Sequence, residues 1–380
     1  MNATIEKLPR SDQVEGVPHP SETSIIFGQQ EAINQFLAAF NAGRLHHAWL
    51  VTGVRGIGKA TLTWQIAKFL LATPDPSNGG GLFGLPEPTL TLYIDKEHPI
   101  VRRIKAGSEP GLMSVRRAYD EKRKKFKQMI TVDEIRNIKS FFTLSATDRG
   151  RRIVIIDCAE EMNQSASNAL LKILEEPPQN AYLFLVSHQP SRLLPTIRSR
   201  CRDLRLKQLT PLDMVRSLDA AEIDVTDIDP NALEVLAGGS VGEAVQLINL
   251  NGLEIFKFIL DIFETLPKLD NKKVIALSEK FSQNNKADSF EFFVSLLELA
   301  LNRLALIGTK SDGQAGKTIF NEAAVFRRIC PNRHAAIRWA KLTQKLSARL
   351  RHGYAVNLDP AALILDTFFQ IEACAAKTAQ

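Results

Sequence analysis

The chain has 380 residues, of which 44% are hydrophobic and 24% are charged, and its formal net charge is +6 at pH 7. This composition is typical of globular proteins, the length allows two or three domains, and the lack of an apolar run of roughly 20 residues excludes a membrane-spanning protein. Residues 1–24 are polar and lack the apolar segment of a signal peptide, so we predict a disordered N-terminal tail and a cytoplasmic protein.

The placement of cysteine and histidine argues against a structural metal site. The four cysteines, at positions 158, 201, 330 and 374, include no pair at C-x-x-C spacing, so neither a zinc site nor a disulfide framework is expected. His46 and His47 are adjacent, but chain neighbours rarely chelate one metal ion. We therefore expect no zinc and no required cofactor.

The first predicted elements are a helix, a strand and a second helix. Residues 30–42 place apolar side chains at helical spacing. The apolar run at residues 48–51 predicts a buried strand, and residues 59–71 return to a helical pattern. A glycine-rich segment, residues 53–59, joins this strand to the second helix. The order is that of the opening of a βαβ unit.

A basic insertion follows at about residues 73–130. It begins with a stretch rich in Pro and Gly at residues 73–90, which interrupts the helical pattern. Between Arg102 and Lys127 there are ten Lys or Arg residues against three Asp or Glu, whereas the rest of the chain has 38 against 39. This local excess is compatible with contact to an anionic partner such as DNA phosphates, and equally with a solvated, partly helical insertion.

Helical and strand patterns alternate after the insertion. The predicted helices cover residues 132–144 and 165–176, and the predicted strands cover residues 152–157, 181–187 and 203–206. The second helix stops at Pro177 because proline cannot donate to the helix ladder. Strands that alternate with helices predict an α/β fold with a parallel sheet and helices on both of its faces.

Only helical patterns remain after Pro211, including long amphipathic segments at residues 290–307 and 334–350. The change in pattern divides the structured chain into three predicted parts. They are an α/β core at residues 25–207, a small helical lid at residues 208–252 and an all-α domain at residues 253–380.

The segment from Gly53 to Lys59 fits G-x-x-x-x-G-K, the pattern of a phosphate-binding loop. Gly53, Gly56 and Gly58 would let the backbone wrap so that its N–H groups face phosphate oxygens at the beginning of a helix. Lys59 would reach the β- and γ-phosphates of bound ATP or ADP. The strand before this loop and the helix after it are the context that the motif requires, so we predict a P-loop fold.

The loop lacks the side chain that normally binds magnesium. A Ser or Thr hydroxyl should follow Lys59, but the residue there is Ala60. Thr61 comes one residue later, and because a helix turns roughly 100° per residue, its hydroxyl should point elsewhere. We expect that nucleotide binding can persist without this magnesium ligand.

The second half of the predicted site is also incomplete. Asp157 ends its strand where a Walker B aspartate belongs, and it could hold magnesium through water. A hydrolysing enzyme would have Glu next, but this chain has Cys158. Glu160 and Glu161 follow at positions expected on a loop rather than at the strand tip. Each missing part should lower the hydrolysis rate about 10²- to 10³-fold.

Two further motifs give the chain a family resemblance. Residues 168–178 read N-A-L-L-K-I-L-E-E-P-P, and residues 195–201 read P-T-I-R-S-R-C. In this order and spacing they resemble the clamp-loader branch of the AAA+ proteins, and the resemblance covers residues 25–250. It implies an AAA+ core, a helical lid and a helical collar domain that forms oligomers.

The resemblance also implies roles for individual residues. Arg200, in the S-R-C motif, corresponds to an arginine finger that acts on ATP bound by the adjacent subunit, although a simple surface ion pair remains the alternative. Ser187 occupies the sensor 1 position at the end of its strand. Gly242 stands where hydrolysing relatives carry the sensor 2 arginine.

The chain has Ala60, Cys158 and Gly242 where hydrolysing relatives carry the magnesium-binding hydroxyl, the Walker B glutamate and the sensor 2 arginine, yet it keeps the S-R-C motif. This combination resembles the delta-prime type of DNA polymerase III subunit rather than the motor type. The implied partners are motor subunits and a delta subunit in a hetero-pentamer, and, through the complex, the sliding clamp and primed DNA. Two alternatives remain open. The chain could be an active AAA+ ATPase motor, or a DNA-binding protein whose P-loop is vestigial and whose basic segment is the active surface.

Overall fold

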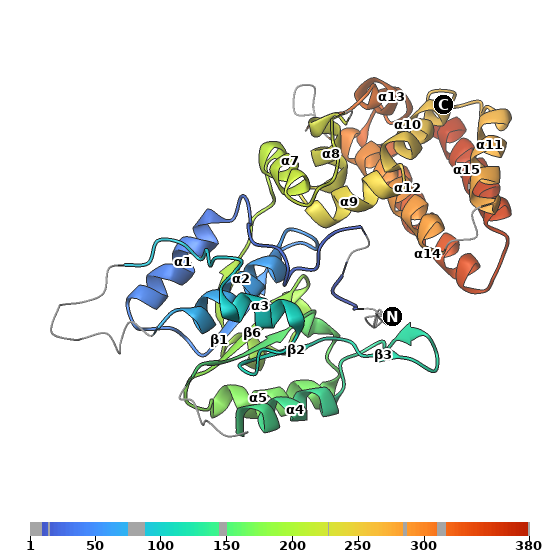
Figure 1. The fold of residues 1–380 in the computed structure, drawn as a ribbon. Helices are drawn as coiled ribbons and strands as arrows, with labels where there is room; N and C mark the ends of the chain where they lie inside the picture. Colours follow the sequence, from blue (N-terminus) through green and yellow to red (C-terminus); the bar gives the residue numbers. More distant parts are fainter. Residues whose placement is uncertain are drawn as a thin grey trace, which may run out of the picture. The chain divides into compact units, whose positions relative to one another are not determined.

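The structure is a computed structural model that describes residues 10–13, 16–74, 88–143, 150–226, 228–283, 287–309 and 317–378. The chain divides into two compact units (Figure 1). The first unit comprises Met1–Thr226 and Gly239–Glu243, and the second comprises Asp227–Gly238 and Ala244–Gln380.

The first unit is built on a parallel sheet of five strands. In spatial order they are β2 (Leu112–Val115), β5 (Arg152–Ile156), β6 (Ala181–Ser187), β1 (Ala48–Thr52) and β7 (Arg202–Arg205). The central strands β1, β5 and β6 are mostly buried and apolar, as expected for a sheet that is covered on both faces. Thr52 pairs with Ser187, so β1 and β6 end side by side at one edge of the sheet.

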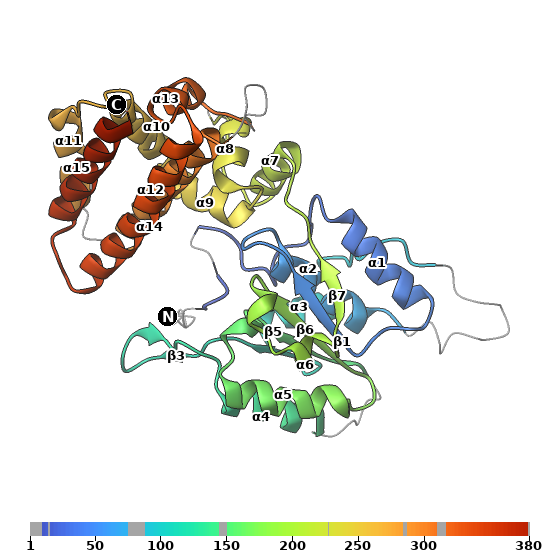
Figure 2. The same cartoon turned by 180° about the vertical axis from the view of Figure 1, so that it is seen from behind.

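Helices cover both faces of this sheet (Figures 1 and 2). One face carries α1 (Gln30–Asn41), α2 (Lys59–Ala72) and α3 (Pro99–Ala106), and the other carries α4 (Val132–Thr143) and α5 (Gln164–Glu175). On the first face the ring of Phe36 packs against Trp49 and Phe184, with centroids 5.3 and 6.3 Å apart. Each such buried side chain contributes about 1.5–3 kcal/mol. The predicted α/β core is therefore confirmed.

The basic insertion contains structure that its composition did not indicate. It includes α3, the edge strand β2, and the strands β3 (Tyr119–Asp120) and β4 (Lys125–Phe126), which pair as an antiparallel hairpin. β2 was not predicted because a strand of four residues is too short to show a clear period. Residues 75–87 of the predicted Pro- and Gly-rich stretch lie outside the described residues.

Part of the segment predicted to be a disordered tail, residues 1–24, packs against the first unit. His19 is only 2% exposed, and its ring meets Trp64 of α2 edge-on at 5.7 Å. Lys68 Nζ, also on α2, donates to the backbone oxygen of Thr23 at 3.0 Å. Polar contacts rather than apolar periodicity hold this segment, which explains why its sequence looked unstructured. Residues 1–9, 14 and 15 lie outside the described residues.

The predicted lid region contains three helices: α7 (Pro211–Asp219), α8 (Pro230–Ala237) and α9 (Val241–Asn249). α7 and the beginning of α9 belong to the first unit, whereas α8 belongs to the second. Within the first unit, the backbone N–H of Leu209 donates to Gly239 at 3.1 Å, which holds residues 239–243 to the segment before α7. The division of the chain into core, lid and collar stays a prediction.

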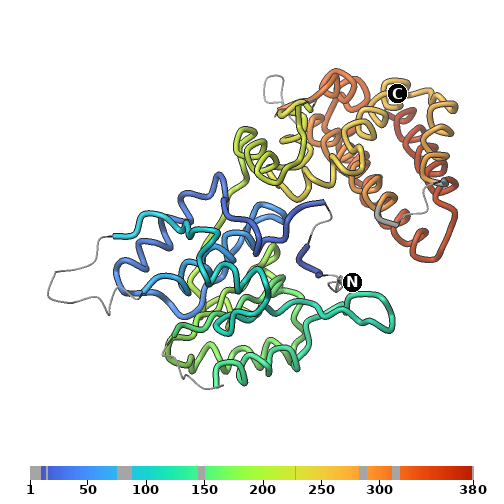
Figure 3. The backbone as a smooth tube through the Cα atoms, viewed as in Figure 1, coloured from blue at the N-terminus to red at the C-terminus, as the bar shows by residue number. Residues whose placement is uncertain are grey.

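The described elements of the second unit are all helical (Figure 3). After α8 and α9 they are α10 (Gly252–Phe263), α11 (Asn271–Gln283), α12 (Ala287–Ile307), α13 (Glu322–Ile329), α14 (Arg333–Ala355) and α15 (Pro360–Thr378). α14 packs against α12 and α15, and its fully buried Trp339 donates from Nε1 to the backbone oxygen of Ile329 at 3.1 Å. The predicted all-α C-terminal region is confirmed. None of the helices in the described ranges is long and apolar enough to cross a membrane.

Candidate nucleotide site

The glycine-rich loop connects Thr52, at the end of β1, to Lys59, the first residue of α2. Gly53, Gly56 and Gly58 have φ angles of 145°, 74° and 94°, which residues with side chains rarely adopt. No side chain caps the beginning of α2, so its first N–H groups remain available to an anion. The loop therefore keeps the backbone shape that a phosphate requires.

Lys59 folds back onto this loop. The residue is only 6% exposed, and its Nζ donates to the backbone oxygen of Val54 at 2.6 Å. Burial lowers the pKa of Lys59, and the nearby carboxyl of Asp157 opposes that shift. A phosphate bound here would accept the hydrogen bond that Lys59 Nζ donates to Val54. The ammonium group is already buried, so it would not have to leave bulk water.

The position of the magnesium-binding hydroxyl is occupied by a methyl group. Ala60 packs against the apolar core beneath α2. The hydroxyl of Thr63, two residues after Thr61, is used within the helix. Its Oγ1 donates to the backbone oxygen of Lys59 at 2.8 Å. Among the described residues, no cluster of three or more His, Cys, Asp and Glu could hold a metal ion. Water-mediated magnesium binding by Asp157 stays a prediction.

Asp157 and Cys158 follow directly after β5. Burial, and then the nearby carboxylate of Asp12, raises the pKa of Asp157 to about 7. Cys158 has a φ of 53°, and its Sγ lies 3.9 Å from Asp157 Oδ2. Burial raises the pKa of the Cys158 thiol, so it stays protonated and cannot take a proton from an attacking water.

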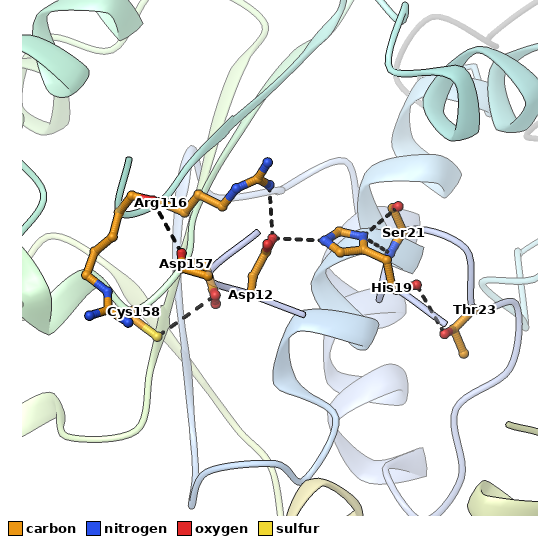
Figure 4. Close-up of polar contacts among 9 residues, drawn as sticks. Asp12, His19, Ser21, Thr23, Arg116, Asp157 and Cys158 are labelled. Carbon is orange, nitrogen blue, oxygen red and sulfur yellow. Dashed lines mark hydrogen bonds and ion pairs between the residues drawn. The ribbon is translucent and has the colours of Figure 1, made fainter. Parts of the chain in front are cut away.

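A charged cluster on the N-terminal segment lies beside Asp157 (Figure 4). Asp12 Oδ2 is 3.0 Å from His19 Nε2 and 3.1 Å from Arg116 NH1, and the side chains of Asp12 and His19 are each 2% exposed. Arg116 follows Val115 of β2, and the backbone oxygen of Val115 accepts a hydrogen bond from Asp157 at 2.9 Å. Sequence reasoning missed this cluster because Asp12 and Arg116 are 104 positions apart and match no motif.

Glu160 lies in a short 3₁₀ turn after the strand, as expected, but its side chain turns back toward the end of β6. The side chain is 1% exposed, and Oε1 accepts hydrogen bonds from the backbone N–H groups of His188 and Gln189 at 2.9 and 3.1 Å. The same oxygen lies 2.6 Å from His188 Nδ1. Burial lowers the pKa of His188, so a neutral ring can donate from Nδ1 to the Glu160 carboxylate.

Ser187 ends β6, at the predicted sensor 1 position, and pairs with Thr52 next to the phosphate loop. It is fully buried, and its Oγ has no hydrogen-bond partner among the described residues. An unsatisfied buried hydroxyl costs about 1–3 kcal/mol, so a phosphate oxygen would suit this position. The residues present therefore fit the phosphate part of a nucleotide.

Gly242 contacts the phosphate loop directly. Its backbone N–H donates to Gly56 at 3.1 Å, and a Cβ placed on Gly242 would lie 3.1 Å from Gly56 Cα. Ser240 Oγ caps this end of α9 by accepting a hydrogen bond from the N–H of Glu243 at 3.1 Å. A side chain at position 242 would crowd the backbone of Gly56, which gives a packing reason for the absence of an arginine there.

Arg200 follows the short helix α6 (Pro195–Arg198) and forms an ion pair at the surface. Its NH2 lies 2.9 Å from Glu175 Oε1, and its NH1 donates to the backbone oxygen of Thr196 at 3.0 Å. The side chains of Arg200 and Glu175 are 37% and 49% exposed, so this pair contributes at most about 1 kcal/mol. Glu175 is thus the acid that the alternative, a simple surface ion pair, requires. The finger role stays a prediction.

A cavity of about 750 Å³ opens beside the loop, and its lining includes Gly53, Val54, Arg198 and Arg205. Neither Lys59 nor Arg200 lines this cavity, so it is not the place where the loop would hold phosphates. The structure therefore brings together the predicted residues of the loop, Asp157 and Ser187, but not Arg200.

Asp157→Asn is expected to stabilise the first unit at alkaline pH. Folding raises the pKa of Asp157 from 3.8 to about 7, so the stability that this carboxyl provides is complete below pH 3.8 and is lost as the pH rises through 7. Asparagine avoids that loss, and the gain should be on the order of 2 kcal/mol at pH 8 and should shrink toward pH 4. Urea unfolding at both pH values measures it. The exposed control Asp219→Asn should give no such pH-dependent gain, and an equal gain from both variants would contradict the assignment.

Comparison with known proteins gives one matching family. Residues 28–210 match the family described as "DNA polymerase III, delta subunit". This match covers the loop, Asp157, Ser187 and Arg200, and it ends before α7.

Individual relatives include proteins named delta' and proteins named gamma. "DNA polymerase III subunit delta'" of Pseudomonas aeruginosa is 33% identical over 233 residues, which are 60% of this chain and 63% of that protein. The Escherichia coli protein of the same name is 29% identical, covering 56% of this chain and 58% of the relative. "DNA polymerase III subunit gamma" of Buchnera aphidicola is 28% identical, covering 69% and 67%. The chain therefore spans less than two thirds of the length of these two delta' relatives.

Proposed function

We propose that the chain is the non-hydrolysing, delta-prime type of subunit in an AAA+ clamp loader, because residues 28–210 match the family described as "DNA polymerase III, delta subunit" and relatives named delta' are similar to it. In this role it supports DNA replication by assembling with subunits that hydrolyse ATP. It carries out neither polymerase chemistry nor ATP turnover of its own.

The observation that carries this proposal is an intact phosphate loop without the groups that drive hydrolysis. The backbone at Gly53, Gly56 and Gly58 is shaped for phosphate, and Lys59 lies at the loop. Ala60 supplies no magnesium ligand, and the protonated thiol of Cys158 cannot orient or deprotonate water. Because defects of this kind each cost about 10²–10³ in rate, binding of ATP or ADP can persist while turnover is lost.

Arg200 is the residue through which this chain would act on a neighbour. The guanidinium is fixed by Thr196 and by a partly exposed carboxylate, Glu175, which a γ-phosphate can replace at little cost. An arginine fork grips phosphate oxygens and stays charged at any relevant pH. Arg200 therefore suits a finger that completes the ATP site of an adjacent motor subunit.

The proposed partners follow from this role. The chain would assemble in the cytoplasm with motor subunits and a delta subunit into a hetero-pentamer, and it would meet the sliding clamp and primed DNA through that complex. The helical domain at residues 253–380 would contribute to the collar of the assembly.

An active motor subunit is the second candidate. Glu160 favours it, because this buried acid acts electrostatically on Lys59 and its Oε2 has no hydrogen-bond partner among the described residues. Such a carboxylate would be free to orient a water. The gamma-named relative is also compatible with this candidate.

ATP turnover by the isolated chain separates the two candidates. We expect a rate no higher than that of the Lys59→Ala variant, because Ala60 and Cys158 replace both hydrolytic groups. Co-purification with the motor subunits should at the same time show a complex. Turnover that Lys59→Ala abolishes would contradict the non-hydrolysing role and establish the motor alternative.

A further inference from the structure

The β3–β4 hairpin carries positive charge that the nucleotide site does not use. Its two strands, Tyr119–Asp120 and Lys125–Phe126, are joined by residues 121–124, and the hairpin projects from the sheet and helices of the first unit (Figures 1 and 2). The exposed side chains at its tip are one acid, Glu121, and four cations: Lys122, Arg123, Lys124 and Lys125.

The base and the tip of this hairpin differ in how their charges are compensated. Cations at the base each meet a carboxylate: Arg116 with Asp12, Arg117 with Glu161 and Lys127 with Glu134, at 3.1, 2.8 and 3.2 Å. At the tip, no acid of the described residues lies within ion-pair distance of Lys122, Lys124 or Lys125. Arg123 lies 3.9 Å from Asp120, and its side chain is 85% exposed. The fold therefore neutralises the base and leaves the tip positive.

Local contacts hold the tip in a fixed shape. Asp120 Oδ1 accepts hydrogen bonds from the backbone N–H groups of Lys122 and Arg123 at 3.0 and 3.1 Å, so its carboxylate closes the turn. The rings of Tyr119 and Phe126 pack edge-on across the strands at 5.3 Å. The exposed lysines thus extend from an ordered hairpin, which reduces the conformational entropy that is lost when a partner binds.

We propose that this tip binds the phosphate backbone of DNA. Residues 121–125 carry four cations, one acid and no apolar side chain, whereas a protein partner would normally bury apolar groups as well. Because contacts to phosphate carry no sequence information, we expect binding at the tip to be independent of DNA sequence. The choice of DNA over another polyphosphate rests on the proposed function.

The salt dependence of DNA binding by the isolated full-length chain tests this contact. A fluorescently labelled primed duplex is titrated with wild type and with a variant in which Lys122, Arg123, Lys124 and Lys125 are changed to Gln. Loss of four phosphate contacts should reduce the slope of log Kd against log salt by roughly 3 to 4 and weaken binding at low salt at least tenfold. The matched control changes four exposed lysines on α3 and in the second unit to Gln: Lys105, Lys257, Lys268 and Lys272.

The outcomes are distinct. A reduced slope for the hairpin variant, with a wild-type slope for the control, supports the contact. Equal slopes for all three proteins, or no binding by wild type even at low salt, overturn it. An unchanged slope together with weaker assembly of the loader would instead identify an acidic protein as the partner of the tip. Because binding is measured without other subunits, failure here leaves the proposed role in ATP turnover untouched.

Discussion

Arg200→Ala is expected to lower ATP turnover by a reconstituted clamp loader, with clamp and primed DNA present, at least tenfold and up to about 10³-fold. The effect is large because a finger neutralises charge on the transferring phosphate only in the transition state. The side chain is 37% exposed and its ion pair with Glu175 is weak, so the substitution should leave the fold and the assembly intact. The measurement is the steady-state rate, with complex formation checked by size-exclusion chromatography.

Two further variants show whether the effect belongs to Arg200 itself. Arg216→Ala removes another partly exposed arginine, which lies 3.9 Å from Asp213 on α7, and it should leave turnover unchanged. Glu175→Gln breaks the ion pair but keeps Arg200, so it should also retain turnover. If Arg200 were only a structural partner of Glu175, Arg200→Ala and Glu175→Gln would have the same effect on turnover. Wild-type turnover in Arg200→Ala would falsify the finger role.

Sequence patterns were sufficient where one short segment determines the structure. The central strands β1, β5 and β6 are apolar runs because both faces of the sheet are buried. Such apolar runs can be recognised from the amino-acid sequence alone. The phosphate loop was predictable because its three glycines adopt backbone angles that other residues rarely take. These features place Lys59, Asp157 and Ser187 at one edge of the sheet.

Contacts between distant segments could not be predicted in this way. Asp12 reaches Arg116 only because the chain packs the polar N-terminal segment beside β2, and neither residue belongs to a periodic pattern. The contact of Gly242 with Gly56 likewise depends on where residues 239–243 return to the loop. The proposed finger role of Arg200 depends on a site in another chain, so no pattern within this sequence could predict its geometry.

Glu160 shows how a local turn changes the meaning of a residue. The 3₁₀ turn, in which the N–H of Glu161 donates to Cys158 at 2.8 Å, reverses the chain after β5. The Glu160 side chain then reaches His188 and Gln189 beyond the end of β6. It thereby ties the segment after β5 to the segment after β6, which the order of residues alone did not indicate.

Glu160→Ala is accordingly expected to destabilise the first unit by about 3 kcal/mol. The substitution removes the acceptor of two backbone N–H groups, and each buried donor left unpaired costs about 1–3 kcal/mol. Glu160→Gln keeps a carbonyl acceptor of similar size and should cost on the order of 1 kcal/mol. The measurements are urea unfolding and hydrogen–deuterium exchange over β5 and β6, which report on this unit rather than on the helical one.

The neighbouring residue provides the control for this substitution. Glu161 pairs with Arg117 at 2.8 Å, and both side chains are more than a quarter exposed, so Glu161→Ala should cost less than about 1 kcal/mol. Faster exchange at the end of β6 in Glu160→Ala alone would show that this carboxylate holds Ser187 and His188 against the segment after β5. If both alanine variants lose the same stability, the buried hydrogen bonds of Glu160 do not hold the two segments together, and its free Oε2 would then favour a role toward bound nucleotide.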